Sequence, residues 1–211
     1  MGERTQLAAD QEALERLEQA DTGLPARQEL EAGEVPSNDS RVVEEPAVVA
    51  LLERQLAAAR WLLGAAEDRD LARTQWEKAD GVALLACGGT LGAVRVPACL
   101  VWAAAGTEDL EEVDAFLRRW FIRGAVFMDL HSLLYYVLVP GATAAEWTDG
   151  EFPGVEYLGR DHYLGVPAVR LTEARGRSYW CVPMDGPGDL CYMGEVLQLL
   201  KQGQAARQKT P

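Results

Sequence analysis

The chain has 211 residues, 48% of them hydrophobic, and a formal net charge of −13. That length and content suffice for one domain with a real core plus extensions, and the acidic balance opposes non-specific attraction to phosphate backbones. No apolar run approaches the roughly 18–20 residues that span a bilayer, and residues 1–6 are polar, unlike a signal peptide. We therefore expect a soluble, cytoplasmic protein without a membrane partner.

The four cysteines, Cys87, Cys99, Cys181 and Cys191, are widely spaced in apolar surroundings. A zinc site would need closer pairs or neighbouring histidines, and the whole chain has two histidines. We expect four buried, reduced thiols.

Residues 1–42 are predicted to form a disordered acidic arm. Within it, residues 5–20 place Leu7, Leu14 and Leu17 on one side of a short helix. That helix either frays in solvent or folds when it docks on a partner. Residues 21–42 carry many Gly, Pro, Ser and acidic residues, and they cannot bury enough surface to offset the entropy of ordering.

The ordered domain is expected to span residues 43–203, with a helical part at 43–79. Pro46 suits a first helical turn, and the acids before it suit the helix dipole. Seven apolar residues recur every three or four positions and predict one buried helix face up to about residue 66: Val48, Leu51, Leu52, Leu56, Ala59, Leu62 and Leu63. A shorter helix is predicted over 70–78, with Leu71 and Trp76 as its apolar residues.

Residues 80–203 are predicted to contain the sheet. The continuous apolar run 81–87 is typical of a central strand. Further strands are predicted over 91–96, 124–128, 133–139, 154–158, 163–167 and 178–182, and helices over 97–105, 107–121 and 189–203. The strands within 154–167 are expected to pair around a turn at 160–162, and Gly203 is expected to end the last helix before a disordered tail at 204–211. This order predicts an α/β (α+β) fold with a single mixed sheet and helices packed on it.

Two polar clusters are candidates for chemistry. Asp129 and His131 are two residues apart and would share one face of an extended segment, and Glu156, Asp161 and His162 lie around the turn within 154–167. If both turns met at one sheet edge, these side chains could bind a divalent metal. Solvent-facing turn residues are the alternative. The chain has no phosphate-binding loop, nucleophile elbow or H-E-x-x-H pair.

A family resemblance covers about half of the chain, from Trp76 to Asp185. It is carried by the order and spacing of five pieces: Gly-Val-Ala-Leu-Leu at 81–85, Leu-Gly-Ala-Val-Arg-Val-Pro at 91–97, Tyr-Tyr-Val-Leu-Val-Pro-Gly at 135–141, the whole of 154–167, and Ser-Tyr-Trp-Cys-Val-Pro at 178–183. These pieces resemble small proteins related to the N-terminal domain of bifunctional DNA primase/polymerases, the prim-pol domain. The resemblance implies a palm-like sheet related to the RNA-recognition-motif fold, with helices packed on one face.

The resemblance also implies where an active site would lie. Active members hold two metal ions for nucleotidyl transfer between acids on an early strand, a His on a middle strand and an acid on a later strand. In this chain Arg95 and Pro97 stand at the first position and Leu134 at the second, so only Glu156 matches an acid. One carboxylate cannot hold the metal ions, and Arg95 would repel them. The site is therefore expected to be degenerate.

These observations predict a non-catalytic primase/polymerase-like binding or adaptor module without a cofactor, whose partner is a protein or a nucleic acid. The acidic balance and the docking arm favour a protein. Candidate ligand contacts are Arg95, Tyr135, Arg160 and His162; Tyr135 either stacks bases or packs in the core. The alternative is a divergent metal-dependent nucleotidyl transferase or nuclease that uses Mg or Mn with Asp129, His131, Glu156 and Asp161.

Overall fold

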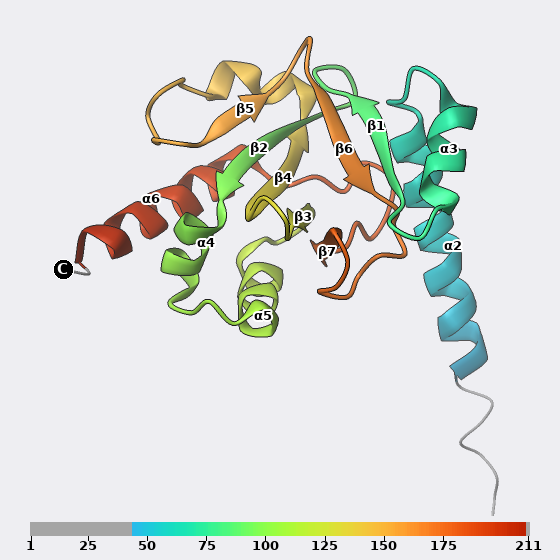
Figure 1. Ribbon diagram of the computed structural model, residues 1–211, viewed down its shortest axis with the longest axis horizontal. Coiled ribbons are helices and arrows are strands. Elements are labelled where there is room, and N and C mark those ends of the chain that lie inside the picture. The colour runs from blue at the N-terminus through green and yellow to red at the C-terminus, as the bar shows by residue number, and fades with distance from the viewer. Residues whose placement is uncertain (1–43, 210–211) are drawn as a thin grey trace, which may run out of the picture. The chain divides into compact units, whose positions relative to one another are not determined.

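The computed structural model describes residues 44–209 (Figure 1), and the arm predicted at 1–42 lies outside the described residues. The described part contains two sheets and helices, as the sequence predicts for its α/β class. None of its helices combines the length and the apolar character that crossing a membrane requires.

Two helices open the described part, α2 (Glu44–Leu63) and α3 (Arg69–Glu77). The C-terminal end of α2 packs into the core through Ala58, Leu62 and Leu63. Leu52 and Leu56, however, are 58% and 51% exposed. The single buried face predicted for this helix is therefore wrong between Leu51 and Leu56, because its buried residues begin at Ala58.

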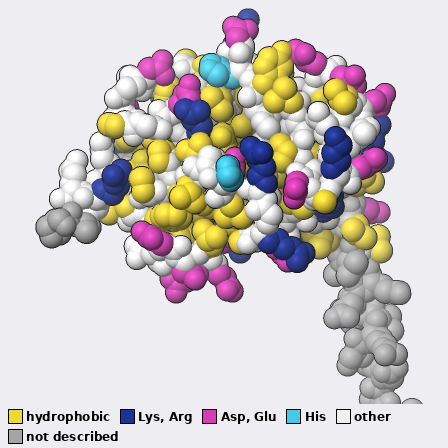
Figure 2. Space-filling view, in the orientation of Figure 1, with side chains coloured by type: hydrophobic (Ala, Val, Ile, Leu, Met, Phe, Trp, Pro, Cys, Tyr) yellow, Lys and Arg dark blue, Asp and Glu magenta, His cyan; other side chains and the backbone are white. Residues whose placement is uncertain are grey.

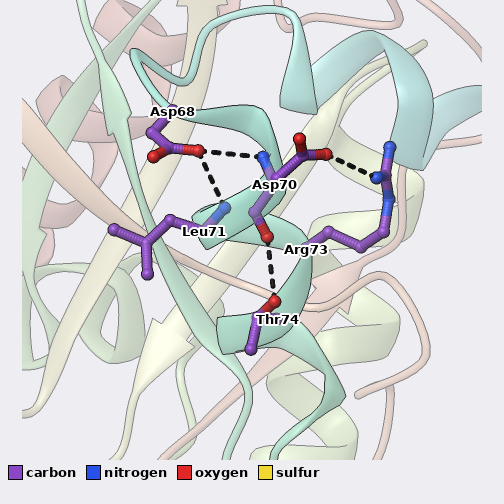
Figure 3. A network of polar contacts seen from close by, with 5 residues as sticks. All are labelled: Asp68, Asp70, Leu71, Arg73 and Thr74. Atoms are coloured by element: carbon purple, nitrogen blue, oxygen red, sulfur yellow. Dashed lines mark hydrogen bonds and ion pairs between the residues drawn. The ribbon is translucent and has the colours of Figure 1, made fainter.

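The start of α3 is fixed by local polar contacts (Figure 3). Asp68 caps the helix, since one of its carboxylate oxygens accepts the backbone N–H groups of Asp70 and Leu71 at 3.1 and 2.9 Å. Inside the first turn, Arg73 pairs with Asp70 at 2.9 Å, and the Thr74 hydroxyl donates to the Asp70 carbonyl. The cap is the contact that sets where α3 begins and so how its apolar side meets the sheet.

The larger sheet has five strands in the order β5-β2-β4-β3-β7, and every neighbouring pair is antiparallel. Its strands are β2 (Leu91–Pro97), β3 (Ala125–Asp129), β4 (Leu134–Pro140), β5 (Glu156–Leu158) and β7 (Ser178–Val182). Helices α4 (Ala98–Ala105) and α5 (Leu110–Trp120) connect β2 to β3, and β4 returns between those two strands. This is a split β-α-β arrangement, the core of ferredoxin-like sheets.

The two faces of this sheet are covered differently. One face packs on α4, α5 and α6 (Met193–Lys209), through side chains such as Val94, Val137 and Met128. The other face carries Phe127, Leu138 and Trp180 and packs under a second sheet together with α2 and α3 (Figure 1). The domain thus has two hydrophobic layers with the five-stranded sheet between them.

The second sheet corrects the prediction of one mixed sheet. It has two antiparallel strands, β1 (Val82–Ala86) and β6 (Tyr163–Pro167), in the register Ala86 opposite Tyr163. The strands predicted to pair within 154–167 therefore lie in different sheets, because β5 pairs with β2 and β6 pairs with β1. The turn between them carries the chain from one sheet to the other, with Asp161 in the left-handed region at φ 67°.

Helix α6 corrects the prediction at the C-terminus. It begins at Met193 and continues through the predicted tail to Lys209. Gly203 does not end it. A Cβ atom on Gly203 would lie 2.2 Å from the carbonyl oxygen of Leu100, so this glycine lets α6 cross α4 at close range.

Candidate functional site

An open cleft of about 690 Å³ lies where the second sheet leaves the five-stranded sheet uncovered. Its polar lining comes from α3 and the following turn, from the end of β3, from β4 and from the start of β7 with the residue before it: Gln75, Lys78, Asp80, Asp129, Tyr136, Arg177 and Ser178. A neighbouring hollow shares Asp80 and Arg177 and adds His131. Cations and carboxylates therefore face the same opening. Figure 2 shows Lys and Arg side chains interspersed with Asp and Glu side chains over the face that it draws.

One row of side chains crosses the sheet beside this cleft. The strand register places Glu156 opposite Arg95, Arg95 opposite Tyr136, and Tyr136 opposite Phe127. The carboxylate of Glu156 pairs with the Arg95 guanidinium at 2.5 Å. The rings of Phe127 and Tyr136 stack with centroids 4.8 Å apart. The row thus presents a neutralised ion pair followed by an aromatic surface.

Tyr136 is the half-buried residue at the centre of this row. Burial raises its pKa above the ordinary tyrosine value, and the carboxylates of Asp129 and Glu156 raise it further, while Arg95 and Arg177 oppose the shift. Two carboxylates and two guanidinium groups therefore act electrostatically on the Tyr136 hydroxyl. The Tyr136 hydroxyl is consequently protonated at neutral pH and available as a hydrogen-bond donor.

Asp129 lines the cleft and also stabilises the turn between β3 and β4. One carboxylate oxygen accepts the backbone N–H groups of His131 and Ser132 at 2.9 and 3.3 Å, which holds the turn between β3 and β4. Ser178 lies directly opposite Asp129 on β7, and its buried hydroxyl has no hydrogen-bond partner among the described residues. Asp129 and His131 are therefore neighbours, as the sequence predicts, but the contact between them is a hydrogen bond from the His131 backbone that stabilises the turn.

The four residues of the metal-dependent alternative, Asp129, His131, Glu156 and Asp161, do not converge. Asp129 lies at the end of the sheet where β2 finishes, since it is opposite Leu134, which is opposite Pro97. Asp161 lies near the other end of β2, in a turn that packs on the loop before that strand. Glu156 is engaged with Arg95. Between residues 49 and 209, no three His, Cys, Asp or Glu side chains are grouped as metal ligands would be.

The predicted ligand contacts also separate into two places. Arg160 and His162 belong to the turn that packs beside Gly88. A Cβ atom on Gly88 would lie 2.4 Å from the Arg160 backbone, and the His162 carbonyl accepts the Cys87 N–H. Arg95 lies on the sheet next to the cleft. These three residues therefore do not form one binding patch.

Tyr135, the fourth predicted ligand contact, does not reach the cleft, and the next residue, Tyr136, lines it instead. The Tyr135 ring is fully buried on the helical side of the sheet, where its hydroxyl accepts the indole N–H of Trp102 at 3.2 Å. Tyr136 takes the place on the cleft side. Besides Tyr136, the sequence interpretation missed Lys78, Asp80 and Arg177, which come from turns without a motif.

Three of the four cysteines are buried thiols, as predicted, whereas Cys99 is exposed at the start of α4. Burial raises the pKa of the Cys87 thiol to about 11, and burial also raises those of Cys181 and Cys191. The buried thiols are therefore protonated at neutral pH and do not act as nucleophiles.

A second feature is apolar and lies on the outer face of the β1–β6 sheet. Leu84 of β1 and Tyr163 of β6 point outward there and are 56% and 50% exposed. A hollow of about 150 Å³ links them to Leu71 of α3, and Glu67 and Asp68 lie at its edge. We call this surface the outer groove: Glu67, Asp68, Leu71, Leu84 and Tyr163.

Comparison of the chain with protein-family models, with curated proteins and with solved structures finds no match.

Proposed function

We propose that this chain is a non-catalytic relative of the prim-pol domain that acts in the cytoplasm as an adaptor by binding a protein. The strand pairings support the non-catalytic part. The position at which the resemblance would put the first acids carries Arg95, and this arginine neutralises Glu156, the one acid that remains. Pro97 also stands where the first acids are expected, and Leu134 stands where the His is expected. These two residues face each other on β2 and β4 and offer no metal ligand.

The observation that carries the binding part is the exposed outer groove. Leu71, Leu84 and Tyr163 are large apolar side chains that are each at least half exposed and line one hollow. The inward-facing residues of the same two strands, such as Leu85 and Val166, are fully buried. Solvent-facing strand positions are ordinarily polar, and contiguous exposed apolar side chains mark interaction sites. A protein surface is the partner that such a groove fits.

Photo-crosslinking in cells tests this function. A photo-reactive residue at position 84 is expected to yield one discrete crosslinked protein, and Tyr163→Lys in the same chain is expected to remove that product. The matched control places the photo-reactive residue at Ile122, which follows α5, is 85% exposed and does not line the groove. A diffuse ladder from both positions, or no product from position 84, would contradict protein binding through this face.

A nucleic acid is the second candidate, and the cleft favours it. Lys78 and Arg177 line the opening beside the stacked ring of Tyr136, an arrangement that suits a phosphate next to a base. Fluorescence anisotropy with single- and double-stranded oligonucleotides at low salt is the test. Binding that weakens at least tenfold in Arg177→Ala, but not in Arg119→Ala on the solvent side of α5, would establish it. Absence of binding at 50 micromolar protein, a concentration chosen for the assay, would remove it.

A further inference from the structure

Both charged residues that line the outer groove are acidic. Glu67 and Asp68 line the hollow, and Asp161 is close enough to Tyr163 to act on its hydroxyl electrostatically. No Lys or Arg is among the residues that line this hollow, which all belong to the described part. The groove therefore combines an apolar floor with a carboxylate rim.

Within residues 49–209, no ion pair neutralises these carboxylates. Each ion pair between described residues joins an acid to an arginine, as in Arg95–Glu156 and Arg123–Asp189, and none of these pairs includes Glu67, Asp68 or Asp161. Glu67 accepts the hydroxyl of Tyr163, a neutral donor, and Asp68 accepts backbone N–H groups at the start of α3. Their negative charges are left to face solvent beside the apolar side chains.

From this juxtaposition we propose that the outer groove receives a cationic amphipathic segment of a partner protein. Apolar side chains of the segment cover Leu71, Leu84 and Tyr163, and its Lys or Arg side chains lie opposite Glu67, Asp68 and Asp161. This inference rests on the proposed adaptor function and names the chemistry of its partner. Complementary charge sets the orientation of such a segment and raises the rate of association.

Charge also argues against the other occupants of this face. A second copy of the chain would bring the same carboxylates together across a two-fold axis, and such like-charge contacts are unfavourable. A nucleic acid or an anionic membrane surface would meet the same repulsion, which the net charge of −13 reinforces. A basic amphipathic segment is the occupant whose binding both the apolar side chains and the carboxylates of the groove would favour.

Titration of the full-length protein with three fluorescent 18-residue peptides tests the proposal. The first is an amphipathic helix of Leu and Lys, the second has Glu in place of Lys, and the third has Ser in place of Leu. We expect the Leu/Lys peptide to bind at least tenfold more tightly than either of the others, and its affinity to fall as salt is raised.

Variants place this binding in the groove. Leu84→Ser is expected to weaken the Leu/Lys peptide about tenfold, and Glu67→Gln several-fold, whereas Ile122→Ser removes an exposed apolar side chain elsewhere and is expected to change nothing. Leu84 and Ile122 are both exposed, so neither change disturbs the core. Equal binding of the Leu/Glu peptide, or binding unaffected by Leu84→Ser, would overturn the proposal.

The outcomes separate this inference from the proposed function. A discrete crosslinked partner from position 84, together with no preference for the cationic peptide, overturns the basic segment and leaves the adaptor function in place. Selective, Leu84-dependent binding of the Leu/Lys peptide without any crosslinked partner in cells supports the chemistry of the groove and counts against the adaptor function.

Discussion

Tyr135 and Tyr136 are neighbours in β4 and face opposite sides of the five-stranded sheet. Tyr135 lies in the layer under the helices, whereas Tyr136 stacks on Phe127 beside the cleft. Truncation of a fully buried aromatic side chain costs about 3–5 kcal/mol. We expect Tyr135→Ala to destabilise the domain by this amount and Tyr136→Ala by less than about 2 kcal/mol, because half-burial gives a smaller transfer free energy.

Urea unfolding of the two variants measures this difference. Equal m-values would show that both changes act on the same cooperative unit. A larger loss of stability in Tyr136→Ala than in Tyr135→Ala would contradict the assignment of the two faces.

Asp114 is a buried acid whose pKa gives stability a pH dependence. Burial raises its pKa above the ordinary value of 3.8, although the hydroxyl of Tyr179, which donates to it at 3.0 Å, and the charge of Arg118 oppose the shift. Because the folded-state pKa is raised, the protonated acid favours folding at low pH, and this contribution is lost as pH rises through the folded pKa.

Asp114→Asn keeps an acceptor for Tyr179 and removes the titration. The unfolding free energy of the variant, relative to that of the wild type, is expected to be highest at neutral pH, where the wild type carries a buried charge. This advantage is expected to shrink as the pH falls toward 4, because Asp114 then becomes protonated. Urea unfolding at several pH values checks this. A difference that grows on acidification would contradict the raised pKa.

At the scale of elements, the crossing of α4 and α6 depends on one glycine. Alanine is a better helix former than glycine by about 1 kcal/mol, but a Cβ atom on Gly203 would collide with the backbone of Leu100. We expect Gly203→Ala to destabilise by about 1–3 kcal/mol because the two helices must move apart. Gly194→Ala, in the same helix with no atom within 4 Å of the added Cβ, is the control and should stabilise by up to about 1 kcal/mol.

Thermal unfolding of both glycine variants is the measurement. If Gly203→Ala raised the melting temperature as Gly194→Ala is expected to, the close contact between α4 and α6 would be wrong.

Local patterns predicted the elements, but not which strands pair with one another. The apolar runs and turn residues marked most strands and helices within a few positions, because side-chain periodicity and Gly or Pro signals are local. The segment 154–167 shows the limit. Its pattern reads as a strand, a turn and a strand, yet its two halves pair with β2 and β1, more than 60 positions earlier in the chain. Such pairings are set by contacts that no short stretch contains.

The candidate site was predicted less well for the same reason. Arg95 and Glu156 were named separately, but their ion pair follows from the β2–β5 pairing. Alternation along β4 could have separated Tyr135 from Tyr136, since neighbouring positions face opposite sides, but it cannot tell which side is buried. Lys78, Asp80 and Arg177 carry no motif and meet only in the folded chain.

At the scale of the whole molecule, the two sheets explain why the apolar run 81–87, which predicts a central strand, does not form one. A strand that is apolar on both faces is ordinarily buried on both. β1 instead belongs to a two-stranded sheet whose inner face packs on the five-stranded sheet and whose outer face reaches solvent. The apolar residues of that outer face, Leu84 and Tyr163, are half exposed and lie outside the core.

Primer extension and nuclease assays with Mg²⁺ and Mn²⁺ test the central claim most directly, because the proposal denies that the sheet face performs chemistry. With Arg95 bound to Glu156, we expect the wild-type protein to show no nucleotide incorporation or cleavage above a sample of Glu156→Ala prepared in parallel. Metal-dependent activity in the wild type that Glu156→Ala abolishes would contradict the proposal.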